Sequence, residues 1–191
     1  MAAESLSIVP ALRLPFNAAY PVQITQGFHG PFHRLIGPQQ LDYALDFGLS
    51  YGSIVRAARR GIVALLSMDS NVYSSDPQPD VARIQLLSRF TANFILLDHG
   101  EFQTLYAHLQ KGSQRVEQGQ AVEAGQVLAR TGRSGWVGDI PNLHFQAQRW
   151  TKQDVATGHR GRTATLPVRF ADYDRPLEHD QIVGCVQRAQ S

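Results

Sequence analysis

The stretch that decides the fold is Pro141-Asn142-Leu143-His144-Phe145-Gln146-Ala147-Gln148. Its apolar residues, Leu143, Phe145 and Ala147, alternate with polar ones. A period of two predicts a β-strand with one apolar and one polar face. His144 lies on the polar face, and Asn142 must point the same way because it stands two residues earlier. The sequence therefore predicts that His144 and Asn142 face one cleft.

The same alternation is clearest in residues 41–49, where every second residue is Leu, Tyr or Phe. Asp42 and Asp46 share the opposite face of this predicted strand, and two carboxylates on one face need partners or a cation. Helical periodicity is absent almost everywhere in the chain. The sequence therefore predicts an all-β domain of many short strands.

A hairpin is predicted farther along the chain. The runs 93–98 and 102–109 flank the turn-forming residues His99-Gly100-Glu101. On the second run, strict alternation places His108 on the face of Tyr106.

Composition limits the classes of protein to consider. A chain of 191 residues with 43% hydrophobic and 18% charged residues fits one domain with a packed core. A formal charge of +2, without a Lys/Arg cluster, gives no indication of nucleic-acid binding. The lone Cys185 excludes an internal disulfide framework and a multi-cysteine zinc site. No apolar run is long enough to span a bilayer, so an integral membrane protein is not expected.

Three segments carry residues that suit catalysis or metal binding. A loop from Gly27 to Gln40 is rich in glycine and proline and contains His29 and His33. The second and third segments are Tyr106-Ala107-His108-Leu109 and Leu143-His144-Phe145.

Together with glycine-punctuated short strands, these segments resemble the lysostaphin/LytM-type zinc metallopeptidases over about residues 23–150. The supporting stretches, in chain order, are Tyr43-Ala44-Leu45-Asp46-Phe47, Gly52-Ser53-Ile54-Val55-Arg56-Ala57-Ala58, Gly61-Ile62-Val63, Asp98-His99-Gly100, Thr104-Leu105-Tyr106-Ala107-His108-Leu109 and Ala124-Gly125-Gln126-Val127. The resemblance implies a single-domain β-sandwich or barrel-like fold of short antiparallel strands, of the duplicated hybrid motif type. It also implies one zinc ion and hydrolysis of peptide cross-links in bacterial peptidoglycan.

The family's functional residues carry over position by position. Asp46 matches the family's aspartate ligand, and His144 matches the second histidine of its His-x-His motif, which is also a ligand. His108 matches the catalytic histidine of the Tyr-x-His-Leu strand. Zinc with three protein ligands lowers the pKa of a bound water to about 7, and a nearby histidine can accept a proton or stabilise an oxyanion.

The first histidine ligand is less directly indicated. Many relatives carry it four residues before the aspartate, but Asp42 stands there. A subgroup places the histidine earlier, after a glycine-rich loop, and by that likeness His33 is favoured over His29. A set that uses Asp42 stays open, since zinc accepts oxygen ligands.

Asn142 departs from the family, which has histidine there as a second catalytic residue. Asparagine can orient a water or bind an oxyanion, but it cannot act as a base near neutral pH. Losing a general base forfeits about 10²–10⁴ in rate. The resemblance therefore leaves two functions open: an endopeptidase, slowed by Asn142, or an inactive relative that serves as a metal-containing binding or regulatory module.

Two segments also resemble parts of carrier proteins. Residues 116–130 look like half of a biotinyl or lipoyl carrier domain, but neither Lys111 nor Lys152, the only lysines, sits between such strands. A sugar phosphotransferase carrier has a related β architecture and would use His144 as phosphate acceptor, which nothing in the sequence favours over zinc.

The resemblance also predicts domain limits and a location. Residues 21–175 would form the metallopeptidase domain, after a leader (1–20) that packs along the surface and before a C-terminal tail (176–191). The family implies the cell envelope, periplasm or extracellular space. The first twenty residues nevertheless lack the basic start and continuous apolar core of a signal peptide.

Overall fold

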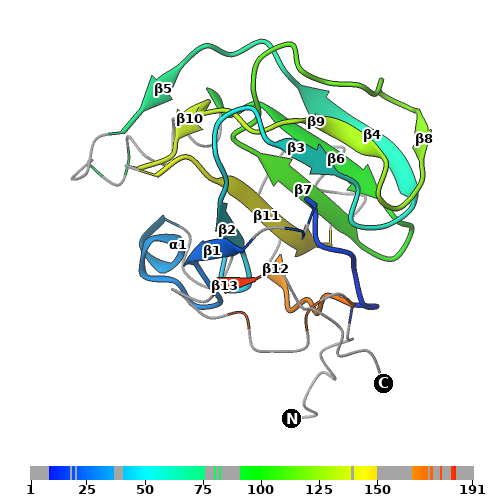
Figure 1. Ribbon diagram of the computed structural model, residues 1–191, viewed down its shortest axis with the longest axis horizontal. Coiled ribbons are helices and arrows are strands. Elements are labelled where there is room, and N and C mark those ends of the chain that lie inside the picture. The colour runs from blue at the N-terminus through cyan, green and yellow to red at the C-terminus, as the bar shows by residue number, and fades with distance from the viewer. Residues whose placement is uncertain are drawn as a thin grey trace.

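The computed structural model describes residues 9–17, 19, 21–36, 41–75, 80, 82, 91–138, 140–149, 165–171, 173, 177 and 182–183. Over these residues the chain is almost entirely β (Figure 1), which confirms the predicted fold class. Cys185 lies outside the described residues. Within them, no helix has the length and hydropathy needed to cross a bilayer.

One antiparallel sheet forms the body of the structure. Its nine strands follow the order β13-β1-β2-β11-β7-β6-β4-β8, and β12 pairs with β11 at the side of this path. In that order the strands are β13 (Ile182–Val183), β1 (Val22–Gln26), β2 (Leu45–Gly48), β11 (Leu143–Gln148), β7 (Gln103–Ala107), β6 (Phe94–Asp98), β4 (Gly61–Ser67), β8 (Ala121–Val122) and β12 (Thr165–Leu166).

Two small sheets complete the described strands. Strand β3 (Ile54–Arg56) pairs antiparallel with β9 (Val127–Arg130), and β10 (Gly135–Trp136) pairs parallel with β5 (Tyr73–Ser74). The predicted hairpin is confirmed, because β6 and β7 pair antiparallel with Asp98 opposite Gln103.

Strand β11, predicted from the period of two, lies between β2 and β7 in the sheet (Figure 1). His144 is opposite Asp46 on β2 and opposite Ala107 on β7. Because residues directly opposite one another project from the same face, the polar face of β11 meets Asp46. This register brings together parts of the chain about a hundred residues apart.

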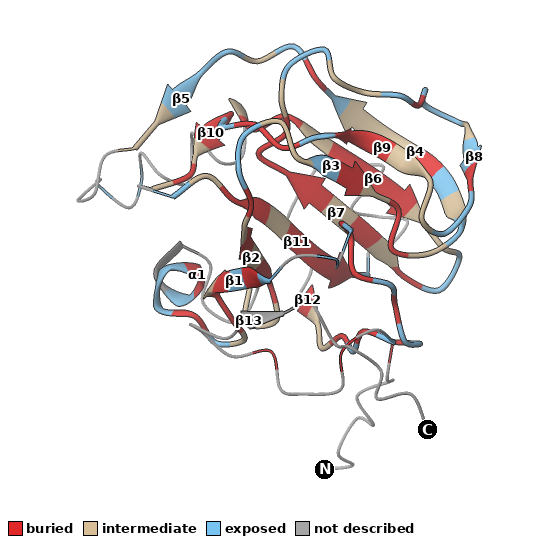
Figure 2. Cartoon of the chain, in the orientation of Figure 1, coloured by how far each residue is buried: buried red, intermediate tan, exposed pale blue. Residues whose placement is uncertain are grey.

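The other face of β11 belongs to the hydrophobic core. Leu143, Phe145 and Ala147 are fully buried, and Phe145 contacts the rings of Tyr106 and Phe170 at centroid distances of 5.3 and 5.8 Å. Figure 2 shows buried residues concentrated on the central strands. Burial of a side chain such as Leu143 or Phe145 contributes about 1.5–3 kcal/mol, so the core stabilises the central strands.

The described stretch of the expected leader, residues 9–17, contributes side chains to this core, which corrects the expectation that it packs along the surface. Val9, Leu12, Leu14 and Phe16 are all buried. Leu12 also bonds through its backbone to Arg169 and Ala171, at 2.9 and 2.7 Å. At the other end of the chain Leu177 is buried and β13 pairs with β1, so parts of the expected tail also join the fold.

Two elements beside the polar face of β11 differ from expectation. The loop after Gly27 contains a six-residue helix, α1 (Pro31–Ile36), which is under two turns long and leaves no periodicity in the sequence. Proline is well suited to the first helical position because its missing N–H would be unpaired there. Strand β2 begins only at Leu45, since residues 41–44 form a turn closed by Ala44 N–H and Leu41 O.

Candidate metal centre

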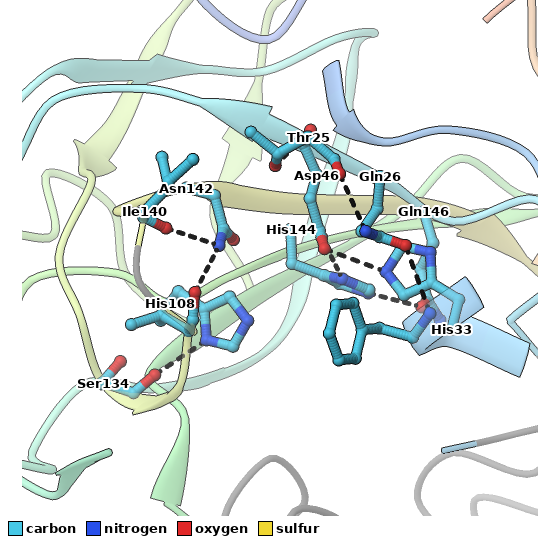
Figure 3. A network of polar contacts seen from close by, with 12 residues as sticks. Thr25, Gln26, His33, Asp46, His108, Ser134, Ile140, Asn142, His144 and Gln146 are labelled. Carbon is cyan, nitrogen blue, oxygen red and sulfur yellow. Dashed lines mark hydrogen bonds and ion pairs between the residues drawn. The ribbon is translucent and has the colours of Figure 1, made fainter. Parts of the chain in front are cut away.

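Three side chains from three elements converge at the polar face of β11 (Figure 3). His33 comes from α1, Asp46 from β2 and His144 from β11, and one candidate ligand atom of each lies within 4.8 Å of the others. Asp46 Oδ1 is 2.8 Å from His144 Nδ1, and Asp46 Oδ2 is 3.1 Å from His33 Nε2. These are the three residues that the sequence comparison with the family selected as ligands.

The donor set suits a zinc ion. His33 is 2% exposed. Its Nε2 lies 3.1 Å from Asp46 Oδ2 without the alignment of a hydrogen bond, and its Nδ1 has no hydrogen-bond partner among the described residues. Buried polar atoms are rarely left unpaired in a protein, so each such atom needs an explanation. Two imidazoles and a carboxylate that leave room for a further ligand are a typical set for a catalytic zinc.

Opposite charges dominate the electrostatics of Asp46 and His144. Burial alone would raise the pKa of the Asp46 carboxyl, but His33 and His144 outweigh it and hold that pKa below its usual range. Burial alone would lower the pKa of His144, yet the hydrogen bond and charge of Asp46 raise it above its ordinary value. Asp46 is therefore an anion at neutral pH, as a metal ligand must be.

His108 approaches the same group from the end of β7. Its ring centroid is 5.9 Å from that of His144. Strict alternation would turn His108 toward the core face of Tyr106, but His108 adopts a φ of 62°. This left-handed backbone breaks the alternation and turns the ring to the side of His144, which corrects the expected shared face.

The protonation of His108 follows from its surroundings. Nδ1 is 2.8 Å from the Ser134 carbonyl, which can only accept, so Nδ1 carries the proton and Nε2 has a lone pair. Burial lowers the pKa of His108 to about 4, and positive charge on His144 acts in the same direction. His108 is thus a neutral imidazole at pH 7 with one free basic nitrogen.

A buried polar network holds the backbone around His108. Asn93 donates from its backbone N–H to Ser134 Oγ at 2.8 Å, and Ser134 Oγ donates to Leu109 O at 2.9 Å. The Asn93 amide also donates to Leu109 O and to Ser70 O. Sequence reasoning missed Asn93 and Ser134; a polar residue at the start of the apolar run 93–98 was the available signal.

Asn142 is buried and committed to the chain around it. Its amide nitrogen donates to the carbonyls of Val137 and Ile140, both at 3.1 Å. Because both partners are acceptors, the orientation of the amide is determined. Its Oδ1 has no hydrogen-bond partner among the described residues. As arranged, Asn142 fixes the turn that leads into β11.

The alternative ligands lie apart from this group. His29 Nδ1 is 3.8 Å from Asp42 Oδ1, and Arg34 Nε is 3.6 Å from the same oxygen. His99 binds Arg60 O at 2.7 Å and Thr104 Oγ1 at 2.8 Å, so it is a structural histidine. Phe32 of α1 contacts Trp136 of β10, with ring centroids 5.5 Å apart.

Comparison with known proteins identifies related sequences and structures. Residues 40–157 match the sequence model of Peptidase family M23. This range contains Asp46, His108, Asn142 and His144, whereas His33 precedes it. No curated protein gave a significant match.

Solved structures match with modest similarity. A zinc containing peptidase from Vibrio cholerae is 24% identical with a TM-score of 0.45, and the match covers 71% of this chain and 37% of that chain. A putative peptidase M23 from Pseudomonas aeruginosa is 22% identical with a TM-score of 0.41, covering 72% and 48%. Lysostaphin from Staphylococcus simulans is 21% identical with a TM-score of 0.43, covering 72% and 50%. The chain thus spans half or less of the length of these proteins.

Proposed function

The chain belongs to peptidase family M23, and from this premise we propose that it is a zinc-dependent endopeptidase that hydrolyses peptide cross-links of bacterial peptidoglycan. Members of the family are typically zinc enzymes that hydrolyse peptidoglycan. The observation that carries the proposal is the convergence of His33, Asp46 and His144, whose ligand atoms lie within 4.8 Å of one another.

Each of the three residues has a definite part in holding the ion. His33 offers Nε2 from α1, His144 offers Nδ1 from β11, and Asp46 offers a carboxylate oxygen between them. When bound, zinc with three protein ligands keeps an open position, at which it activates a water near neutral pH and polarises a carbonyl.

His108 supplies the basic nitrogen beside the centre. The Ser134 carbonyl keeps the proton on Nδ1, so Nε2 can accept a proton during attack on the peptide bond. Once protonated, the same nitrogen can donate to an oxyanion or to the leaving amine. The neutral state of His108 at pH 7 suits this role.

Asn142 supports the second candidate function, a metal-containing binding or regulatory module. Its amide nitrogen is engaged by the carbonyls of Val137 and Ile140, and an amide cannot accept a proton near pH 7. An enzyme that relies on His108 alone would be slower by about 10²–10⁴ than one with two catalytic histidines.

A hydrolysis assay distinguishes the two functions. Zinc-loaded protein is incubated with purified peptidoglycan and with oligoglycine peptides, and cleavage is measured. We expect slow cleavage by the wild type. The single substitutions Asp46→Ala and His144→Ala should each abolish both zinc binding and cleavage. Asp42→Ala is the matched control, because Asp42 pairs with His29 and Arg34 and should leave cleavage intact.

Stoichiometric zinc with intact substrates would establish the module instead. Asn142→His then reveals the cause: a gain of about 10²-fold or more in cleavage identifies Asn142 as the reason for the low rate. A protein that takes up no zinc under zinc-replete conditions would overturn the site assignment itself.

A further inference from the structure

The two ring nitrogens of His144 face different partners. Nδ1 lies toward the centre, 2.8 Å from Asp46 Oδ1, and Nε2 points along β11, 2.9 Å from Gln146 Oε1 (Figure 3). The nitrogen that can reach a metal is therefore Nδ1. Without a metal, Nδ1 donates its proton to the Asp46 carboxylate, which can only accept. For Nδ1 to act as a ligand, the metal must replace this proton, and the neutral ring must then carry its one proton on Nε2.

Gln146 is placed to hold that proton. It stands two residues after His144 on the same face of β11, opposite Leu105 of β7, and it is 4% exposed. Its amide nitrogen donates to Gln148 Oε1, so its oxygen is the end that meets His144. Gln148 is itself 2% exposed, which confines the pair to the interior.

We propose that Gln146 is a positioning residue of the metal centre, whose side-chain oxygen keeps the His144 proton on Nε2 and thereby presents Nδ1 to the ion. The proposal rests on the zinc site of the proposed function and names a residue that sets the geometry of that site. Histidine ligands generally donate their second N–H to an oxygen, which fixes the tautomer and the ring orientation.

Burial makes the role of Gln146 hard to replace. With so little of Gln146 exposed, a side chain without an acceptor leaves the Nε2–H of His144 without a partner in the interior. Changes in such outer partners typically weaken metal binding 10–100-fold. The effect should therefore appear in metal affinity, even where catalysis is slow.

The first test measures the zinc dissociation constant by competition with a chelating indicator. We expect Gln146→Leu to weaken zinc binding 10–100-fold, and Gln146→Glu, which keeps an acceptor oxygen, to restore affinity to within about threefold of the wild type or better. The matched control is Gln103→Leu. Gln103 is likewise a glutamine in the large sheet, on β7, but its side chain contacts Asp98 instead of His144. It should bind zinc as the wild type does.

The second test needs no variant and so does not depend on the folding of Gln146→Leu. Nitrogen-15 NMR of the cadmium- or zinc-loaded wild-type protein reports which nitrogen of His144 is metal-bound and which is protonated. We expect metal on Nδ1 and a slowly exchanging proton on Nε2. Metal on Nε2, or wild-type affinity in Gln146→Leu, would overturn the proposal.

The outcomes separate this inference from the proposed function. Zinc binding with the predicted tautomer but without hydrolysis removes the endopeptidase function and leaves the role of Gln146 standing. Hydrolysis by the wild type, with an unchanged zinc affinity in Gln146→Leu, supports the endopeptidase function and removes the role of Gln146. Absence of zinc binding by the wild type overturns both.

Discussion

His108 shows at the scale of one residue how a site departs from the regular sheet. Its φ of 62° lies in a region that side chains other than glycine rarely adopt. Such a conformation costs of order 1–3 kcal/mol and persists where the surroundings determine it. Here the hydrogen bond from Nδ1 to Ser134 O supplies that constraint, and the ring is turned from the core to the metal centre.

We expect His108→Asn to lower the hydrolysis rate about 10²–10⁴-fold while zinc affinity stays within a few-fold of the wild type. Asparagine tolerates the left-handed backbone, so the change removes the basic nitrogen with little strain. Steady-state kinetics and zinc titration measure the two effects. His29→Asn is the control, because His29 is also left-handed, with a φ of 59°, but pairs with Asp42. Equal loss in both variants would contradict the role of His108.

Tyr106 gives a prediction on pH and stability. Burial raises the pKa of its hydroxyl from 10.0 to about 12. The folded protein therefore keeps a proton that the unfolded chain releases in this interval. The stability contributed by the neutral hydroxyl is complete below pH 10 and is lost as pH rises through about 12. The free energy of unfolding should fall by about 1.4 kcal/mol per pH unit in this window.

Urea unfolding of the wild type and of Tyr106→Phe between pH 8.5 and 11.5 measures this dependence. The variant should lose that part of the pH slope, although it is less stable at pH 8.5 because the backbone N–H of Ala58 loses its acceptor. Tyr51→Phe, at an exposed site, should retain the full slope. Identical slopes in all three proteins would show that Tyr106 does not cause the effect.

At the scale of elements, the network around Asn93 connects β6 to the backbone that carries His108. The Asn93 amide joins Ser70 O to Leu109 O, and its backbone N–H holds Ser134 Oγ. Ser134 in turn supplies the carbonyl that binds His108. The position of the basic nitrogen therefore depends on a residue that has no part in the chemistry.

We expect Asn93→Asp to lower the free energy of unfolding by about 1–3 kcal/mol and to reduce hydrolysis without removing zinc. The carboxylate has the same shape but cannot donate, so the Ser70 carbonyl loses the Asn93 donor and the Leu109 carbonyl keeps only the Ser134 hydroxyl. Thermal unfolding, zinc titration and peptidase kinetics measure the three effects. Asn71→Asp makes the same change at an exposed position in the adjoining loop and should be neutral.

The strands and the ligand set differ in how well the sequence predicted them. Period-two patterns identified β11 and the β6–β7 hairpin, because one face of each packs into the core. The same pattern predicted too long a strand for β2. The alternation continues through Leu41 and Tyr43, but these residues lie in a turn. Helix α1 was missed because six residues are too few for a helical period.

The site was accessible mainly through family likeness. Asp46, His108 and His144 stand in recognisable motifs, but His33 precedes the matched range 40–157 and competed with His29 and Asp42. The helical turn of α1 places His33 beside Asp46 and leaves His29 beside Asp42. The hydrophobic pattern of the sequence does not reveal this turn. The roles of Asn93, Ser134 and Gln146 depend on contacts across strands, which one sequence does not reveal.

At the scale of the whole molecule, the metal centre joins α1 to the middle of the large sheet. His33 is the ligand outside the sheet, whereas Asp46 and His144 are opposite one another on paired strands. An ion bound there would link a short helix, which has little stability of its own, to the rigid part of the fold.

We therefore expect zinc removal to act unevenly. The free energy of unfolding, measured by thermal denaturation, should be about 2.7 kcal/mol higher with zinc at a hundred times its dissociation constant than with a chelator. Hydrogen exchange should rise in α1 and change little in β7. Asp46→Asn, which weakens the site, should show the exchange pattern of zinc-free protein in both conditions. Uniform acceleration across the sheet would contradict this local effect.

The place of β11 in the sheet has a consequence for how the chain folds. Strands β2 and β7 are made first, but each waits for the same partner, which is residues 143–148. Until then both carry unpaired backbone edges, which are the kind of surface that associates between chains. Closure over such long sequence separations is slow, on the order of milliseconds to seconds for β-rich domains. The strand that completes the metal centre is thus also the one that covers the open edges of β2 and β7.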